Sequence, residues 1–185
     1  MSDYGLDPRR VDPDYDRHGG FPVFEAADPG PGFGRFLAAM RRLPQYISNL
    51  KHGAWQQSGL KAAGMPPNFG IGNVLRGKTL GIWGYGQIGQ IVAGYGKAFG
   101  MNVRVWGSEA SRAKALTDGY QVASQCEEFL AQCDVVSLHL RLCDATRGIV
   151  TLERLSSMKP TALLVNTSRA ELIEPDALIA ALNRG

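Results

Sequence analysis

The chain has 185 residues, 44% of them hydrophobic and 20% charged, which is the composition of an ordinary globular protein of one domain or slightly more. The formal net charge of +3 is too small to indicate a nucleic-acid partner, and no apolar run reaches the roughly 18 residues that a membrane span requires. The three cysteines, an odd number without a CxxC pair, argue against a disulfide framework or a zinc site and fit a reducing cytoplasm.

Residues 1–34 differ in composition from the rest of the chain. They hold seven acidic and three basic side chains and half of the ten prolines, but only three Ile, Leu or Val residues. So little apolar surface cannot offset the entropy lost on ordering, so we predict an irregular or disordered leader, or one ordered only by docking on another surface. No apolar segment follows its basic residues, so we expect no secretory signal.

A helical pattern begins at Arg35. Apolar residues spaced three and four apart between Phe36 and Leu50 predict one helical stripe, which belongs either to the core or to a face for a partner. Pro44 interrupts the stripe and predicts a kink, or two helices that meet there. The Gly- and Pro-rich segment 59–78 predicts a long irregular connection.

Strand-like and helix-like segments alternate from residue 79 onwards. Pro175 is expected to stand near the first turn of the last helix. Alternating strands and helices predict an α/β fold in which a parallel sheet is covered by helices on both faces. We predict strands at 79–83, 102–106, 120–123, 134–140 and 162–168, and helices at 87–99, 111–119, 126–133, 151–158 and 174–185.

The stretch GKTLGIWGYGQIGQ, residues 77–90, carries a GxGxxG pattern between a predicted strand and a predicted helix. That context predicts a dinucleotide-binding turn, whereas the same glycines elsewhere would indicate only a tight turn. Gly84 would permit the turn, Gly86 would let a pyrophosphate approach the backbone, and Gly89 would let the helix pack closely on the strand. The helix N-terminus would offer free N–H groups and a partial positive charge to the phosphates.

The end of the second strand bears on the choice between NAD and NADP. An acidic residue about 20 positions after the turn commonly holds the adenosine ribose, but Gly107 occupies that place here. Glu109 can reach back to the ribose, or else Ser108, Ser111 and Arg112 can accept a 2′-phosphate. A third reading is that all of them are solvated loop residues. The residues leave both cofactors open, with a slight preference for NAD.

Three stretches resemble the D-isomer-specific 2-hydroxyacid dehydrogenases, the family of D-3-phosphoglycerate, hydroxypyruvate/glyoxylate and formate dehydrogenases. They are GKTLGIWGYGQIGQIVAGYGKAFGMNV, DVVSLHLRLCDATRGIV and MKPTALLVNTSRAELIE, in an order and at separations similar to the family's. The resemblance covers residues 35–185 and implies part of a dinucleotide-binding domain with a Rossmann-type, doubly wound parallel sheet. It implies hydride transfer between a nicotinamide and a small 2-oxo or 2-hydroxy acid. It also implies a homodimer formed through the stripe from Phe36 to Leu50 and the arm that follows.

The resemblance assigns roles to individual residues. Arg169 matches the family's arginine that holds the substrate carboxylate and carbonyl beside the nicotinamide, a task that suits a guanidinium fork. Two residues depart from the family pattern, since Arg141 stands where proline is common and, as a milder change, Ala170 stands where glycine is usual. Three pairs of residues match cofactor-contacting positions of the family. They lie at the start of the phosphate-binding helix (Gln87, Ile88), after the fourth strand (Leu140, Arg141) and beside the nicotinamide (Thr167, Ser168).

The resemblance also implies parts that this sequence lacks. The family's proton-transferring histidine and its supporting glutamate follow the arginine, and most of the substrate domain has no counterpart here. Of His18, His52 and His139, the last ends a buried strand, where the family often carries a structural histidine. We therefore expect a fragment of an enzyme whose autonomous activity is an open question. The alternatives are a non-catalytic dinucleotide-binding module or pairing subunit, and a decayed product without function.

Overall fold

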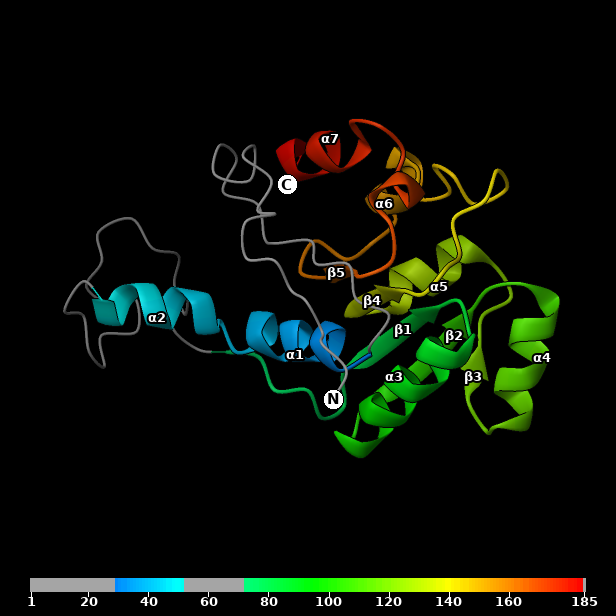
Figure 1. Cartoon of the computed structure of the whole chain (residues 1–185), viewed down its shortest axis with the longest axis horizontal. Helices are drawn as coiled ribbons and strands as arrows, with labels where there is room; N and C mark the ends of the chain where they lie inside the picture. Colours follow the sequence, from blue (N-terminus) through cyan, green and yellow to red (C-terminus); the bar gives the residue numbers. More distant parts are fainter. Residues whose placement is uncertain (1–28, 52–71, 185) are drawn as a thin grey trace, which may run out of the picture.

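A parallel sheet of five strands forms the centre of the computed structural model, which describes residues 29–51 and 72–184 (Figure 1). The strands lie in the order β3-β2-β1-β4-β5, so β1 is central and the chain winds outwards from it in both directions. The predicted parallel α/β sheet is therefore confirmed. The strands are β1 (Thr79–Trp83), β2 (Asn102–Trp106), β3 (Gln121–Val122), β4 (Val135–Leu138) and β5 (Leu163–Asn166).

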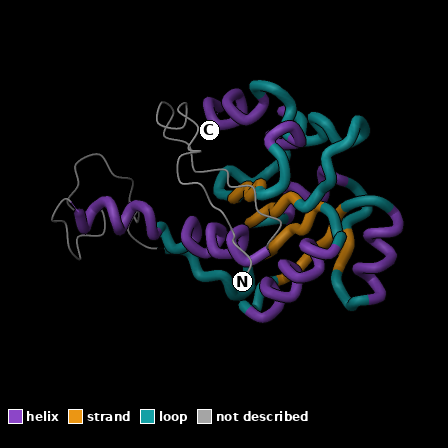
Figure 2. The backbone as a smooth tube through the Cα atoms, viewed as in Figure 1, coloured by secondary structure: helices purple, strands orange, loops and turns teal. Residues whose placement is uncertain are grey.

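Helices cover both faces of this sheet (Figure 2). They are α1 (Pro29–Met40), α2 (Leu43–Lys51), α3 (Gln87–Ala98), α4 (Glu109–Thr117), α5 (Cys126–Gln132), α6 (Leu152–Ser156) and α7 (Ala177–Arg184), with a 3₁₀ turn η1 (Ala170–Leu172). One apolar core contains residues of α1, α3 and α4, and the other contains residues of α5, α6 and α7. The alternation along β1 explains this division, because Leu80 and Ile82 belong to the first core and Trp83 to the second.

The two N-terminal helices divide the predicted apolar stripe between them. They meet at a turn in which Arg42 has φ 53°, close to Pro44, so the prediction of two helices meeting there is confirmed. Pro44 is the second residue of α2, where its missing N–H breaks no intrahelical hydrogen bond. Phe36 of α1 is buried in the core, whereas Ile47 of α2 is 54% exposed.

Helix α1 begins at Pro29, so the prediction of an irregular chain is wrong for residues 29–34. Phe33 is buried, and its ring centroid lies 5.2 Å from that of Tyr95 and 5.4 Å from that of Phe99. This tertiary packing outweighs the low helix propensity of the neighbouring glycines. The rest of the predicted leader, and most of the predicted connection 59–78, lie outside the described residues.

The last helix starts later than the sequence pattern suggests. α7 begins at Ala177, three residues after the predicted start, and Pro175 precedes the helix instead of standing in its first turn. Ile173 forms a parallel bridge with Val150, which keeps the preceding chain extended, and Asp176 has φ 61°. None of the helices in the described chain is long and apolar enough to cross a membrane.

Candidate dinucleotide-binding site

The turn between β1 and α3 leaves no room for a side chain at two of its three glycines. Gly84 has φ +101°, and a Cβ atom there would lie 2.6 Å from the carbonyl oxygen of His139, in the loop after β4. A Cβ atom at Gly89, in the first turn of α3, would collide with the carbonyl oxygen of Gly84. The predicted steric roles are therefore confirmed: Gly84 permits the turn, and Gly89 brings α3 against the end of β1.

Gly86 differs from the other two glycines, since a Cβ atom there would meet no described atom within 4 Å. Gly86 is the N-cap of α3, and as a glycine it has no side chain that could accept a hydrogen bond from the N–H groups of the first turn. The first N–H groups of a helix lack intrahelical acceptors, so they bind anions readily. Gln87 is exposed and Ile88 half-buried in this turn. The open backbone and the N-terminus of α3 fit the pyrophosphate of a dinucleotide.

Tyr85, between the first two glycines, ties the turn to the end of α4. Its side chain is buried, its hydroxyl donates to the carboxylate of Asp118 at 2.9 Å, and its ring packs against Tyr120. Burial raises the pKa of Tyr85, and the hydrogen bond and negative charge of Asp118 raise it further. Nothing in the glycine fingerprint signals this residue, because the position between the glycines carries no fixed residue type.

The loop after β2 borders the glycine turn directly. The N–H of Gly84 donates to the carbonyl oxygen of Trp106 at 2.8 Å, which sets Gly107 beside the turn. Ser108 caps α4, because its hydroxyl oxygen accepts a hydrogen bond from the N–H of Ser111 at 3.3 Å. This cap explains why α4 begins two residues earlier than predicted. Both expected ribose-side residues, Gly107 and Ser108, therefore lie next to the turn.

The loop after β4 forms the other wall of the turn. The Leu140 side chain lies against Gly84, with Cδ2 3.1 Å from the position that a Cβ atom would take there. Arg141 is exposed, and its carbonyl oxygen accepts from the hydroxyl of Thr146 at 2.7 Å. The Thr146 hydroxyl oxygen also accepts from the N–H of Cys143 at 2.9 Å. Thr146 thus fixes the loop that carries both expected cofactor contacts.

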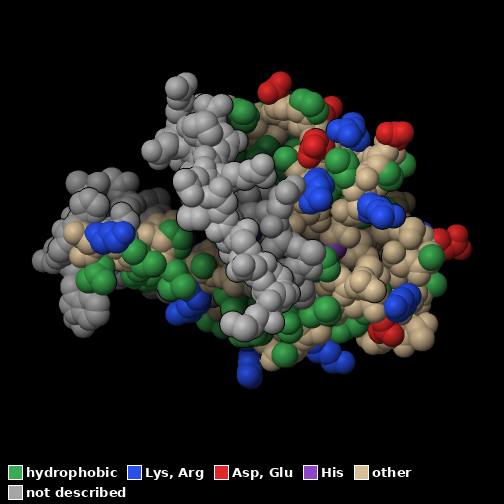
Figure 3. All heavy atoms as spheres, viewed as in Figure 1, with side chains coloured by type: hydrophobic (Ala, Val, Ile, Leu, Met, Phe, Trp, Pro, Cys, Tyr) green, Lys and Arg blue, Asp and Glu red, His purple; other side chains and the backbone are tan. Residues whose placement is uncertain are grey.

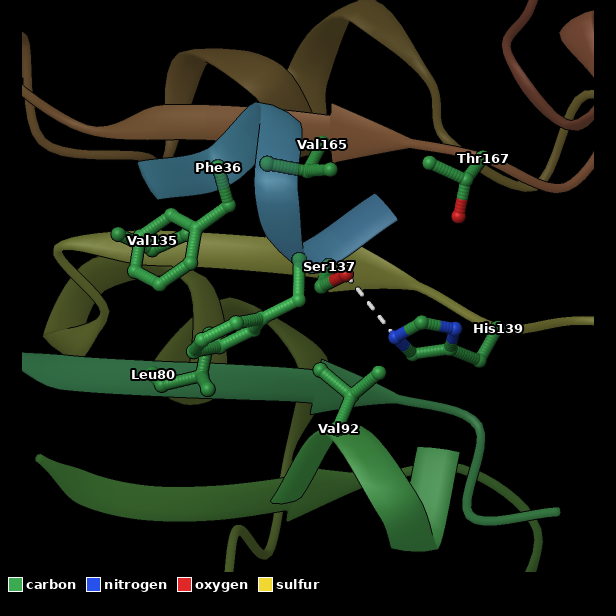
Figure 4. A pocket seen from close by; sticks show the side chains of 9 residues that line it. Phe36, Leu80, Val92, Val135, Ser137, His139, Val165 and Thr167 are labelled. Atoms are coloured by element: carbon green, nitrogen blue, oxygen red, sulfur yellow. Dashed lines mark hydrogen bonds between the residues drawn. The ribbon is translucent and has the colours of Figure 1, made fainter. Parts of the chain in front are cut away.

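His139 lines a small pocket between α1, α3 and the ends of β4 and β5 (Figure 4). Its Nε2 atom shares a hydrogen bond with the hydroxyl of Ser137 at 2.9 Å. Burial lowers the pKa of His139 to about 4, so the ring is neutral near pH 7. A neutral, half-buried imidazole that is hydrogen-bonded to a hydroxyl of the preceding strand has the features of the expected structural histidine.

The chain beyond β5 carries the last three expected residues. The hydroxyl of Ser168 donates to the carbonyl oxygen of Leu138 at 3.0 Å, which ties the end of β5 to the end of β4. The side chain of Asn166 accepts from the N–H of Ser168 at 3.0 Å and donates to the carbonyl oxygen of Arg169 at 2.8 Å. Arg169 is exposed, and Thr167 lines the pocket shown in Figure 4.

The expected site residues thus gather along one edge of the sheet, beyond the carboxyl ends of β1, β2, β4 and β5. Ligands of open parallel sheets bind in the crevice at this edge. Within residues 29–51 and 72–184, no group of three or more His, Cys, Asp or Glu side chains suits a metal ion. The strand, the sterically required glycine turn and the open helix N-terminus define a dinucleotide-binding α/β domain.

Comparison with known proteins identifies the family. Residues 33–185 match the D-isomer specific 2-hydroxyacid dehydrogenase, NAD binding domain, and the chain belongs to this family. A glyoxylate reductase from Aeropyrum pernix is 39% identical over 149 residues, which are 80% of this chain and 43% of that protein. A D-3-phosphoglycerate dehydrogenase from Methanocaldococcus jannaschii is 36% identical over 152 residues, 82% of this chain and 27% of that protein.

Solved structures share the doubly wound fold. A structure from Ralstonia solanacearum, assigned as a D-3-phosphoglycerate dehydrogenase, is 60% identical with a TM-score of 0.79, over 90% of this chain and 48% of that one. A D-lactate dehydrogenase from Aquifex aeolicus, solved with NAD and lactic acid, is 30% identical with a TM-score of 0.73. That match covers 85% of this chain and 44% of the other. The chain therefore spans less than half the length of these relatives.

Proposed function

We propose that the chain binds a nicotinamide dinucleotide and forms the cofactor half of an oxidoreductase that acts on small 2-oxo and 2-hydroxy acids. The observation that carries this proposal is the glycine turn. Gly84 and Gly89 are sterically required, while Gly86 faces open space at the N-terminus of α3. The family, and relatives named as a dehydrogenase and a reductase, agree with the proposal.

The proposed contacts follow one another along the sheet edge. Gly107 and Ser108 lie on the ribose side, the glycine turn and α3 take the pyrophosphate, and the loop 140–141 walls the crevice between them. Thr167 and Ser168, fixed to the end of β4, line the nicotinamide side. The nicotinamide, when bound, supplies or accepts the hydride.

Arg169 is the residue that we place on the substrate. It stands exposed beyond β5, and its backbone is held because the Asn166 side chain donates to its carbonyl oxygen at 2.8 Å. A guanidinium group presents parallel N–H donors that suit a carboxylate. The same donors stabilise the negative charge that develops on a carbonyl oxygen during reduction.

His139 favours a second candidate function, a non-catalytic dinucleotide-binding module or pairing subunit. Reduction of a 2-oxo acid requires a proton as well as a hydride, and an imidazolium is the usual donor. His139 is the one histidine in the part of the chain that the structure describes, and it is neutral, half-buried and bonded to Ser137. Under this second function the chain binds a dinucleotide without turnover.

The exposed face of α2 is the surface that we propose for a homodimer. Its apolar side chains gather at one end of the molecule (Figure 3). Leu43, Ile47 and Leu50 are 47%, 54% and 50% exposed, and Tyr46 is 37% exposed. Sedimentation of the wild type and of Ile47→Asp at several concentrations tests this contact. A dimer that Ile47→Asp dissociates supports it, and a wild type that stays monomeric at high concentration contradicts it.

Thermal melting of the purified chain without ligand, with NADH and with NADPH tests the proposed function. A ligand at 100 times its Kd stabilises the folded state by about 2.7 kcal/mol, so we expect at least one cofactor to raise the Tm by several degrees. Turnover of glyoxylate or hydroxypyruvate by the loaded chain supports the enzyme, and binding without turnover supports the second function. A cooperative melt that neither cofactor moves contradicts both, and a broad melt indicates a decayed product.

A further inference from the structure

No carboxylate stands at the end of β2, where NAD-specific sites commonly carry one. A carboxylate at the end of this strand accepts hydrogen bonds from the ribose hydroxyls in NAD-specific sites. Gly107 stands there, beside the glycine turn, and brings no side chain. The next carboxylate, that of Glu109, lies two residues further on, in the first turn of α4, and is exposed.

Hydrogen-bond donors gather at the same loop. The hydroxyl of Ser108 donates to that of Ser111 at 3.1 Å, which leaves the Ser111 proton for an outside acceptor. The first turn of α4 adds backbone N–H groups without intrahelical acceptors and the positive end of the helix dipole. These groups suit an anion and offer little to a neutral hydroxyl pair.

Arg112 supplies a fixed cation beside these donors. Its guanidinium carbon lies 5.0 Å from the centroid of the Trp106 ring, so a cation–π contact holds the side chain. Its Nε atom is buried and has no hydrogen-bond partner within residues 29–51 and 72–184. A buried donor without a partner is unfavourable, and an anion that accepts a hydrogen bond from this guanidinium would offset that cost.

We propose that this loop binds the 2′-phosphate of NADP(H), so that the chain takes the phosphorylated dinucleotide in preference to NAD(H). The inference rests on the proposed function, because the glycine turn must hold the rest of the cofactor. The phosphate accepts charge-assisted hydrogen bonds from the guanidinium of Arg112 and from the serine hydroxyls. The matched family model is described as an NAD-binding domain, and the two cofactors differ only by that phosphate.

Two competing roles make different predictions. If Arg112 only packs on Trp106, its replacement lowers stability and weakens both cofactors by the same factor. If Glu109 holds the ribose hydroxyls, the chain prefers NADH, and Glu109→Gln weakens NADH selectively. The ratio of the two dissociation constants separates these roles from phosphate recognition, because a loss of stability alone leaves the ratio unchanged.

Calorimetric titration of the 185-residue chain with NADPH and NADH is the test. We expect NADPH to bind at least about tenfold tighter in the wild type, the size of a hydrogen bond to a charged group. Arg112→Gln should remove most of that preference, and Gly107→Asp should reverse it. Lys114→Gln is the matched control, because it removes the same charge from an exposed position of α4 and should keep the ratio.

The outcomes distinguish this inference from the proposed function. NADH binding as tightly as NADPH, or an unchanged ratio in Arg112→Gln, overturns the inference and leaves dinucleotide binding standing. Binding of neither cofactor overturns both. Adenosine 2′,5′-bisphosphate and ADP repeat the comparison without the nicotinamide, and the bisphosphate should bind more tightly in the wild type but not in Arg112→Gln.

Discussion

The turn after β1 and the loop after β2 lie side by side, joined by the hydrogen bond from Gly84 to Trp106, yet in the proposed site they bind the cofactor in different ways. The turn works through its backbone, and at two positions any side chain would collide with a carbonyl oxygen. In the proposed site the loop binds through side chains, chiefly those of Ser111 and Arg112. Binding through the backbone requires glycine at the positions where a Cβ atom would collide, whereas binding through side chains depends on which residues the loop carries.

The largest effect should come from filling the turn itself. Gly89→Ala places a Cβ atom against the carbonyl oxygen of Gly84, which cannot rotate away as a side chain would. Such overpacking typically destabilises by about 1–3 kcal/mol, and we expect the upper end together with loss of cofactor binding. Thermal melts with and without cofactor measure both effects.

Gly94 supplies the control for this substitution. It lies in the same helix, is exposed, and a Cβ atom there meets no described atom within 4 Å. Gly94→Ala should leave the Tm unchanged or raise it slightly, because alanine favours a helix by about 0.5–1 kcal/mol over glycine. Equal melting temperatures for Gly89→Ala and Gly94→Ala would contradict the steric account of the turn.

Gly86→Val should separate binding from folding. A Cβ atom at this position meets no described atom within 4 Å, so the melting temperature should stay close to that of the wild type. The same side chain occupies the space through which a pyrophosphate reaches the N–H groups of α3, so the affinity for either dinucleotide should fall by at least about tenfold. Titration of the folded variant measures the loss, and an unchanged affinity would place the cofactor elsewhere.

The strand end that supports Gly84 should respond to pH. A free histidine titrates near pH 6.5, but burial lowers the pKa of His139 to about 4 in the folded chain. Between pH 6.5 and pH 4 this histidine is therefore protonated in the unfolded chain but neutral in the folded chain. The free energy of unfolding consequently decreases as the pH falls towards 4. Urea unfolding between pH 7 and 4.5 should show a smaller slope in His139→Gln. Parallel curves would show that this ring contributes nothing.

The smallest effect should come from the hydrogen bond that ties the glycine turn to the C-terminal end of α4. Tyr85→Phe removes the hydrogen bond to Asp118 and keeps the ring packing, so a loss of about 1 kcal/mol is expected. Tyr120→Phe removes a neighbouring hydroxyl without touching that bond, and should cost less. Urea unfolding of both variants measures the difference, and a larger loss in Tyr120→Phe would refute this role for Tyr85.

Local patterns predicted the parts of the molecule that depend on local physics. The strands 79–83 and 102–106 have the predicted bounds because short apolar runs between glycine-rich turns are typical of buried parallel strands. The positions of Gly84 and Gly89 were predictable because a side chain would collide with backbone there. Long-range contacts decided the rest. Phe33 extends α1 through its packing on Tyr95, and the bridge between Val150 and Ile173 delays α7.

The candidate site shows the same division. Gly107 signalled that the usual carboxylate is missing, but the sequence left NAD and NADP open. The contact of Arg112 with Trp106 joins residues six apart in sequence through a helix cap, and no residue pattern encodes that geometry. The bond between Tyr85 and Asp118 spans 33 positions and is equally invisible to local patterns.

The wedging of Gly84 between the loop after β4 and the first turn of α3 has a kinetic consequence. A segment confined on both sides is ordered when the chain folds, so association with a dinucleotide does not have to immobilise it. The association rate should then rise in proportion to nucleotide concentration without saturating, because no slow conformational step precedes or follows contact at this turn. The glycine turn is therefore already ordered in the free chain, before a dinucleotide binds.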